Sequence, residues 1–233
     1  MWAWLFSTID PTAPHAVGFA VSWHGRFMVL AWGVLAPLAV VFARYFKVMP
    51  GQNWPHELDN QTWWRAHWIG QMVVMGLSVT ALVLVLPLQF SEPTVHGVLG
   101  CAVLVALFVQ VLLGILRGSK GGPTARAADG SLSGDHYDMT PRRKLFEALH
   151  KSIGYCVLLL AGVTIIYGLL QANGPNWMWV VLVLWWCLLA GVAFALERAG
   201  MAMNSYQAIW GNDPAHPGNA NLHDAAPDRI RNH

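Results

Sequence analysis

The chain alternates long apolar blocks with shorter polar connections. Five stretches are dominated by apolar residues, at positions 19–46, 64–88, 95–116, 149–170 and 177–196. Each is long enough to cross a hydrocarbon core of ~30 Å, for which about 20 helical residues suffice. Because no water inside a bilayer satisfies backbone groups, such segments must be helices. The pattern therefore predicts an all-α integral membrane protein with five transmembrane helices.

Composition agrees with a membrane protein. The chain of 233 residues is 55% hydrophobic and only 11% charged, whereas soluble domains carry about 25% charged residues. Cys101, Cys156 and Cys187 all fall inside the apolar blocks and form no spacing framework. We therefore expect them to be small packing residues rather than disulfide partners.

The distribution of basic residues predicts an orientation. The connections after the first and third blocks carry Lys47 and six basic residues between 117 and 144, with Arg44 and Arg65 close by, and the tail adds Arg229 and Arg231, whereas positions 89–94 and 171–176 carry none. Positive loops stay on the cytoplasmic side. We therefore expect a short extracytoplasmic N-terminus over 1–18, a membrane domain over 19–198 and a flexible cytoplasmic tail over 199–233, in the cell (inner) membrane.

Four of the five blocks carry one histidine near their start, namely His24, His67, His96 and His150. A single histidine at such a place is commonly an interfacial residue, but an ionisable side chain in every one of four spans favours a function. Since consecutive spans alternate in direction, His24 and His96 approach the outer face, and His67 and His150 the cytoplasmic face.

Two pairs of imidazoles at two depths predict two six-coordinate haems. Neutral imidazole is a strong axial ligand for haem iron, and helix bundles hold cofactors with side chains from facing helices. The irons would lie roughly 20 Å apart along the membrane normal. The chain contains no Cys-x-x-Cys-His motif, so both haems would be b-type and bound non-covalently.

Neighbours of the histidines fit a flat cofactor. Gly100 and Gly154 each follow a histidine by four residues, and residues at this spacing share a helix face. Close helix packing is the other use of glycine in membranes, and the sequence leaves both readings open. Arg65 is a candidate partner for a haem propionate, since arginine binds carboxylates with two hydrogen bonds.

These residues resemble the cytochrome b561 family in the form often joined to DOMON domains. The resemblance covers about 19–173. It is carried by Trp23-His24-Gly25-Arg26 with Pro37 and Ala43-Arg44-Tyr45, Arg65-Ala66-His67 with Gln71, Val95-His96-Gly97-Val98-Leu99-Gly100 with Gln110, and His150 with Gly154-Tyr155. It implies a four-helix core with two haems, bound by the first and third and by the second and fourth histidines. The remaining fifth helix and the short N-terminus differ from the ascorbate-linked six-helix members and from the DOMON fusions.

The sequence thus predicts a di-haem b-type cytochrome that moves electrons between redox partners on opposite faces, or to and from the quinone pool. It would be an oxidoreductase if it acts directly on a small substrate. The alternative is a haem-containing anchor or assembly subunit of a larger redox complex. We expect a partner redox protein or quinone and no nucleic acid; a homo-oligomer stays open, as do the donor, the acceptor and the direction of flow.

Two further sequence features could indicate a functional site. Glu147-Ala-Leu-His150 could belong to a carboxylate-bridged metal site, but such a site needs a second Glu-x-x-His and further buried glutamates, which the spans lack. The polar loop over 118–140, with Asp135, His136 and the basic residues Arg142 to Lys144, is a candidate docking surface on the cytoplasmic side.

Overall fold

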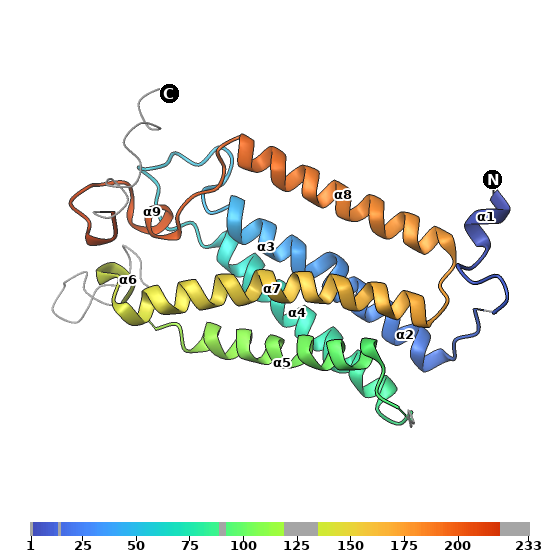
Figure 1. Ribbon diagram of the computed structural model, residues 1–233. Helices are drawn as coiled ribbons and strands as arrows, with labels where there is room; N and C mark the ends of the chain where they lie inside the picture. Colours follow the sequence, from blue (N-terminus) through green and yellow to red (C-terminus); the bar gives the residue numbers. More distant parts are fainter. Residues whose placement is uncertain (1, 14, 89–91, 119–134, 220–233) are drawn as a thin grey trace.

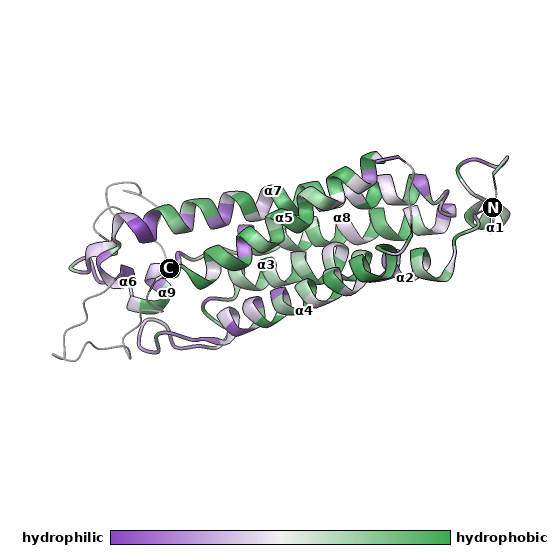
Figure 2. Ribbon diagram, turned by 90° about the horizontal axis from the view of Figure 1, so that it is seen from below, coloured by the Kyte–Doolittle hydropathy of each residue, from purple (hydrophilic) through white to green (hydrophobic). Residues whose placement is uncertain are grey.

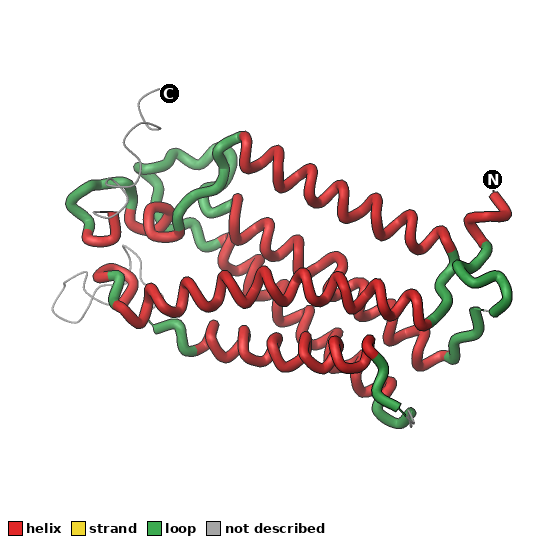
Figure 3. Tube along the Cα trace, viewed as in Figure 1, coloured by secondary structure: helices red, strands yellow, loops and turns green. Residues whose placement is uncertain are grey.

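The computed structural model describes residues 2–13, 15–88, 92–118 and 135–219. Five helices are long and apolar enough to cross a membrane: Phe19–Tyr45, Thr62–Val85, Val95–Ile115, Pro141–Gln171 and Asn176–Arg198. Figure 3 shows them running side by side, with the connections gathered at the two ends of the bundle. The predicted all-α, multi-pass membrane architecture is confirmed.

The first span is a composite helix. An α-helical half, α2 (Phe19–Met28), leads through a π-helical segment, η1 (Val29–Leu35), into a second α-helical half, α3 (Ala36–Tyr45). Pro37 in the first turn of α3 has no N–H to donate to the Gly33 carbonyl four residues earlier. The indole of Trp185, on another span, donates to that oxygen at 2.7 Å. A side chain from a neighbouring helix therefore replaces part of the lost backbone bonding.

The four core spans pack as two pairs (Figure 1). Helix α4 (Thr62–Val85) lies along α2 and α3, while α5 (Val95–Ile115) lies along α7 (Pro141–Gln171), and η1 contacts both α4 and α7. Trp32 is buried at this junction, and its indole donates to the hydroxyl of the fully buried Ser78 at 3.0 Å. Together these spans form a four-helix core.

The fifth span lies outside that core. Helix α8 (Asn176–Arg198) contacts α3 and the short α1 (Trp2–Phe6) and runs along one side of the bundle in Figure 1. Trp186 of α8 packs beside Gly162 of α7, where an added Cβ would lie 3.7 Å from the indole ring.

The outer surface of the helices is apolar. Large side chains such as Ile115, Leu159 and Phe194 are 74%, 74% and 66% exposed, and Figure 2 shows hydrophobic residues along the helices with hydrophilic ones concentrated toward the ends. An exposed apolar surface of this extent is unusual in a soluble monomer. It is the surface that a bilayer covers.

Helix α7 begins earlier than its apolar block. The Thr140 hydroxyl accepts from the Arg143 amide at 3.3 Å and caps the helix, with Pro141 in the first turn. Both are helix-start signals, so the helix begins at 141 rather than 149. Arg142 to Lys144 and Glu147 consequently lie on the end of a spanning helix rather than in a loop.

The tail differs from the expected flexible segment. Residues 205–210 form α9 (Ser205–Trp210), whose Tyr206 and Trp210 are buried. They pack against α6 (Asp135–Asp138), where the ring of His136 stacks on Tyr206 with centroids 5.8 Å apart. The aromatic residues of this polar tail have apolar surface to bury, which gives it structure as far as Asn219. Residues 220–233 lie outside the described part.

Candidate cofactor-binding site

One pair of histidines lies at the end of the bundle where α5 begins. His24 comes from the second turn of α2, and His96 from the first turn of α5, which the Thr94 hydroxyl caps by accepting from the Gly97 amide at 3.1 Å. The two ring centroids are 6.0 Å apart and the ring planes are inclined by 85°. We call His24 and His96 the outer pair.

Backbone carbonyls hold both rings of the outer pair. His24 Nδ1 lies 3.0 Å from the Ala81 carbonyl oxygen of α4, and His96 Nδ1 lies 3.0 Å from the Thr164 carbonyl oxygen of α7. Because a carbonyl only accepts, Nδ1 must carry the hydrogen, and in the neutral ring Nε2 keeps its lone pair. This is how metal-binding histidines are usually oriented.

The other pair lies toward the opposite end of the bundle. His67 of α4 and His150 of α7 have ring centroids 6.2 Å apart and planes inclined by 83°. His67 Nδ1 lies 3.2 Å from the Ala39 carbonyl oxygen, so it shares the tautomer of the outer pair. His150 stacks on Phe146 at 5.2 Å, and its buried Nδ1 has no hydrogen-bond partner in the described chain. We call His67 and His150 the inner pair.

The carbonyl contacts also fix the separation of the two pairs. Thr164, at the level of His96, is fourteen residues from His150 along α7, and Ala81, at the level of His24, is fourteen residues from His67 along α4. At a rise of 1.5 Å per residue, both helices place the pairs about 21 Å apart. Two independent helices therefore give the same spacing.

The donor set of each pair matches a haem iron better than a bare metal ion. Within the described residues, no three or more His, Cys, Asp or Glu side chains gather as a metal site, whereas a porphyrin supplies the equatorial donors itself. Metal–imidazole nitrogen bonds are about 2 Å long. Adding roughly 1.2 Å from each nitrogen to its ring centre puts the ring centres of two imidazoles on one iron about 6.4 Å apart, close to the observed 6.0 and 6.2 Å.

Three glycines border the pairs. A Cβ built on Gly100 would meet only a Thr164 methyl at 4.0 Å, and one on Gly154 only the Gln110 amide nitrogen at 3.6 Å, so neither helix face is tightly packed. A Cβ on Gly168 would lie 2.9 Å from the His96 ring. Gly168 is therefore the position whose bare backbone admits a histidine, and its role was not predicted.

The expected arginine lies on the helix surface. Arg65 is exposed, and its guanidinium donates to Gln61 Oε1 at 3.5 Å on its own helix. Arg143 is buried instead: Nε donates to Glu147 at 3.1 Å, while Nη1 has no partner among the described residues. Lys151 binds the same carboxylate at 2.9 Å. Arg143 is thus a buried cation near the inner pair whose guanidinium keeps a donor free among the described residues.

The structure describes only the ends of the candidate docking loop. Residues 119–134 lie outside the described part, and His136 is 1% exposed beneath α9. Burial, together with the charge of nearby Arg143, lowers the pKa of His136 to about 4. Because its ring is buried and neutral at physiological pH, His136 belongs to the packing of the tail and is not a docking residue.

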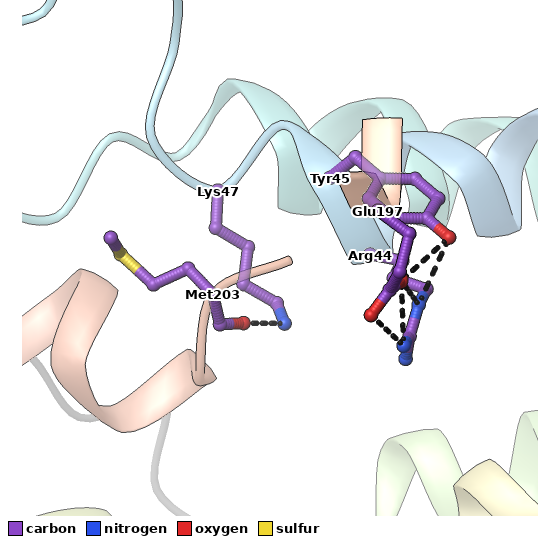
Figure 4. A network of polar contacts seen from close by, with 5 residues as sticks. All are labelled: Arg44, Tyr45, Lys47, Glu197 and Met203. Atoms are coloured by element: carbon purple, nitrogen blue, oxygen red, sulfur yellow. Dashed lines mark hydrogen bonds and ion pairs between the residues drawn. The ribbon is translucent and has the colours of Figure 1, made fainter. Parts of the chain in front are cut away.

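A second polar network fastens α8 and the tail to α3 (Figure 4). Arg44 Nη2 donates to Glu197 at 2.9 Å, and the Tyr45 hydroxyl donates to the same carboxylate at 3.0 Å. Nearby, Lys47 donates to the Met203 carbonyl at 2.6 Å. The contacts of Arg44, Tyr45 and Lys47 were not predicted, because Glu197 and Met203 are remote from them in sequence.

Comparison with known proteins gives one informative relative. A Drosophila melanogaster protein that carries the name of a ferric-chelate reductase 1 homolog is 27% identical to this chain over 164 residues, which is 68% of the chain. The match spans 22% of the length of that relative. No family model matches the chain. No solved structure matches it either.

Proposed function

We propose that this chain is a di-haem b-type cytochrome that transfers electrons across the membrane in the manner of the cytochrome b561 family. The observation that carries the proposal is the pairing of histidines from alternate spans, with ring centroids 6.0 Å apart in the outer pair and 6.2 Å apart in the inner pair. The similarity to a protein named for ferric-chelate reduction supports a membrane electron-transfer role.

In this proposal His24 and His96 hold the outer haem, and His67 and His150 the inner one. Bound haem supplies a one-electron iron couple at each depth. The histidines would serve as the iron ligands and leave no iron site open to small molecules, while the carbonyls on Nδ1 keep the rings of His24, His67 and His96 in one orientation. Such fixed ligation suits electron transfer better than substrate chemistry at the iron.

Other residues have supporting roles. Gly100 and Gly154 leave flat backbone beside a histidine of each pair, against which a porphyrin can lie. The buried Arg143, with its unpartnered Nη1, is a stronger candidate than the exposed Arg65 to receive a propionate of the inner haem.

The proposed orientation places the N-terminus outside and the C-terminus in the cytoplasm.

The proposal also includes the molecules with which the chain exchanges electrons. A redox protein at either face or the quinone pool remains the expected partner, and the name of the Drosophila relative adds ferric chelates to the acceptors to be assayed. The alternative function is that of a haem-containing anchor or assembly subunit of a larger redox complex. It predicts haem binding without electron exchange by the isolated protein.

Haem counting and ligand replacement test the proposal. Purified protein should contain two b-type haems per chain by pyridine haemochrome quantitation. His24→Ala and His96→Ala should remove the same spectral and potentiometric component, and His67→Ala and His150→Ala the other. His15→Ala is a matched control, because His15 Nδ1 also lies on a backbone carbonyl, that of Ala172 at 2.7 Å, but should leave both haems in place.

Two results would contradict the proposal. Colourless protein after expression with ample haem would exclude the cofactor. Loss of one shared component in His24→Ala and His67→Ala would exclude the proposed pairing.

A further inference from the structure

A cavity of about 360 Å³ opens between α3, α7 and α8. Its lining combines apolar and hydrogen-bonding side chains from all three helices, namely Val40, Val41, Arg44, Tyr45, Tyr155 and Ala193. A volume of this size is at the lower end of small-molecule sites. Since all three helices are membrane spans, a ligand would enter from the bilayer.

Arg44 and Tyr45 form the polar end of the cavity, and the positive charge of Arg44 is already neutralised. The Arg44 guanidinium forms an ion pair with Glu197 at 2.9 Å, and the Tyr45 hydroxyl donates to the same carboxylate, as Figure 4 shows. An anionic lipid headgroup would have to compete with that carboxylate for the guanidinium. A neutral ligand that accepts hydrogen bonds, with Tyr155 as a donor from α7, fits the lining better.

The cavity and the inner pair share two helices at similar depth. Val40 directly follows Ala39, whose carbonyl holds His67. Tyr155 follows His150 by five residues on α7, a rise of about 7.5 Å and a turn of about 140° around the helix. A ligand bound here would therefore lie on the other side of α7 from His150, about one helix diameter from the site proposed for the inner haem.

We infer that this cavity binds the headgroup of a membrane quinone, which exchanges electrons with the inner haem. The inference rests on the proposed function and specifies its partner. A quinone ring is flat and neutral, its carbonyl oxygens accept hydrogen bonds, and its isoprenoid tail would pass between α7 and α8 into the lipid. Each of these properties matches the lining described above.

When one quinol is oxidised in this cavity, both of its O–H bonds break and the two quinone carbonyls form. Two electrons leave, one at a time, and each reduces one ferric haem iron to the ferrous state. The two protons pass to water at the polar end of the cavity, where the side chains of Arg44 and Glu197 are 42% and 47% exposed. The reverse direction uses the same groups.

Quinol-dependent haem reduction tests the inference. Holoprotein in detergent, with its haem content measured, is mixed with decylubiquinol or a short-chain menaquinol, and haem reduction is followed by stopped-flow absorbance. Tyr155→Phe removes the proposed donor and Ala193→Leu partly fills the cavity. Each should slow reduction roughly tenfold, as expected for the loss of one hydrogen bond or its equivalent. Haem content, midpoint potentials and reduction by dithionite should stay unchanged.

A matched control and a binding assay separate the outcomes. Tyr167→Phe changes an exposed tyrosine on the same helix outside the cavity and should leave quinol reduction unaltered. In nanodiscs, a photoreactive azidoquinone should label peptides containing Tyr155 or Ala193. Excess quinone should prevent this labelling, whereas excess anionic phospholipid should not.

The inference and the proposed function can fail separately. Two haems per chain with equal quinol rates in wild type, Tyr155→Phe and Ala193→Leu would overturn the quinone site and leave the cytochrome standing. Labelling that phospholipid prevents and quinone does not would also overturn it, in favour of a lipid site. Protein without haem would contradict the cytochrome and the electron exchange together.

Discussion

The indole of Trp185 on α8 donates a hydrogen bond to the Gly33 carbonyl on the first span at 2.7 Å. Pro37 has no N–H to donate to that carbonyl. The Trp185 contact therefore joins the peripheral helix α8 to the π-helical segment of the first span. It shows that α8 does more than cover the core.

Replacing Trp185 by Phe should therefore destabilise the protein by about 1 kcal/mol, the usual net value of one hydrogen bond. The ring volume is largely kept, while the Gly33 carbonyl loses its donor. Thermal unfolding in detergent should show the loss. Trp177→Phe, at a 40% exposed site on the same helix, is the control; an equal loss there would mean that only ring burial matters.

Gly168→Ala should disturb the outer pair selectively. The added Cβ would lie 2.9 Å from the His96 ring, and moving the ring would break its 3.0 Å contact with the Thr164 carbonyl. We expect loss of the outer haem component with the inner one retained, read from redox difference spectra. Gly76→Ala, where a Cβ meets nothing within 4 Å, should bind both haems; retention of both in Gly168→Ala would refute the expectation.

Acid should loosen the packing of the tail. The folded-state pKa of His136, lowered by burial to about 4, lies below its ordinary value of 6.5. Between these pH values the unfolded chain binds more protons, so stability rises with pH across the window and is lost as pH falls from 6.5 to 4. The total effect is on the order of 3 kcal/mol.

Melting temperatures between pH 4 and 7.5 measure this effect. His136→Phe keeps an aromatic ring against Tyr206 and should flatten the pH profile. The control His56→Gln alters an exposed histidine and should not. Parallel profiles for wild type and His136→Phe would assign the acid sensitivity to other groups.

The proposed orientation predicts one-sided labelling of the tail. A cysteine at the exposed Asn212, in a variant with the three native cysteines replaced by serine, should react with a membrane-impermeant maleimide only when the cytoplasmic face is accessible. A cysteine at the exposed Thr12 should react only from outside. Reversed labelling of the two positions would invert the assignment of faces.

The sequence predicted what periodicity and alternation of spans control. Apolar length alone located five helices, with ends displaced most for α7, because its first two turns are polar and capped by Thr140. The rule that alternate spans start at the same face is enough to group His24 with His96, and the structure brings these rings within 6.0 Å.

Features that depend on contacts between distant residues were not predictable. Gly168 looks like any other membrane glycine until α5 places the His96 ring against it. Tyr206 and Trp210 stand in a polar tail, and only the packing on His136 shows why they are ordered. The cavity beside Tyr155 likewise requires three helices whose relative placement no local pattern encodes.

The π-helical segment Val29–Leu35 holds one residue more than a continuous α-helix would need between α2 and α3. Deleting one residue within this segment would let the first span close into a regular α-helix, with His24 still facing α5 and Ala39 still facing His67. The same deletion in α4 between His67 and Ala81 has no extra residue to absorb it and would turn these two residues by about 100° relative to each other. The first span should therefore tolerate a shortening that α4 should not.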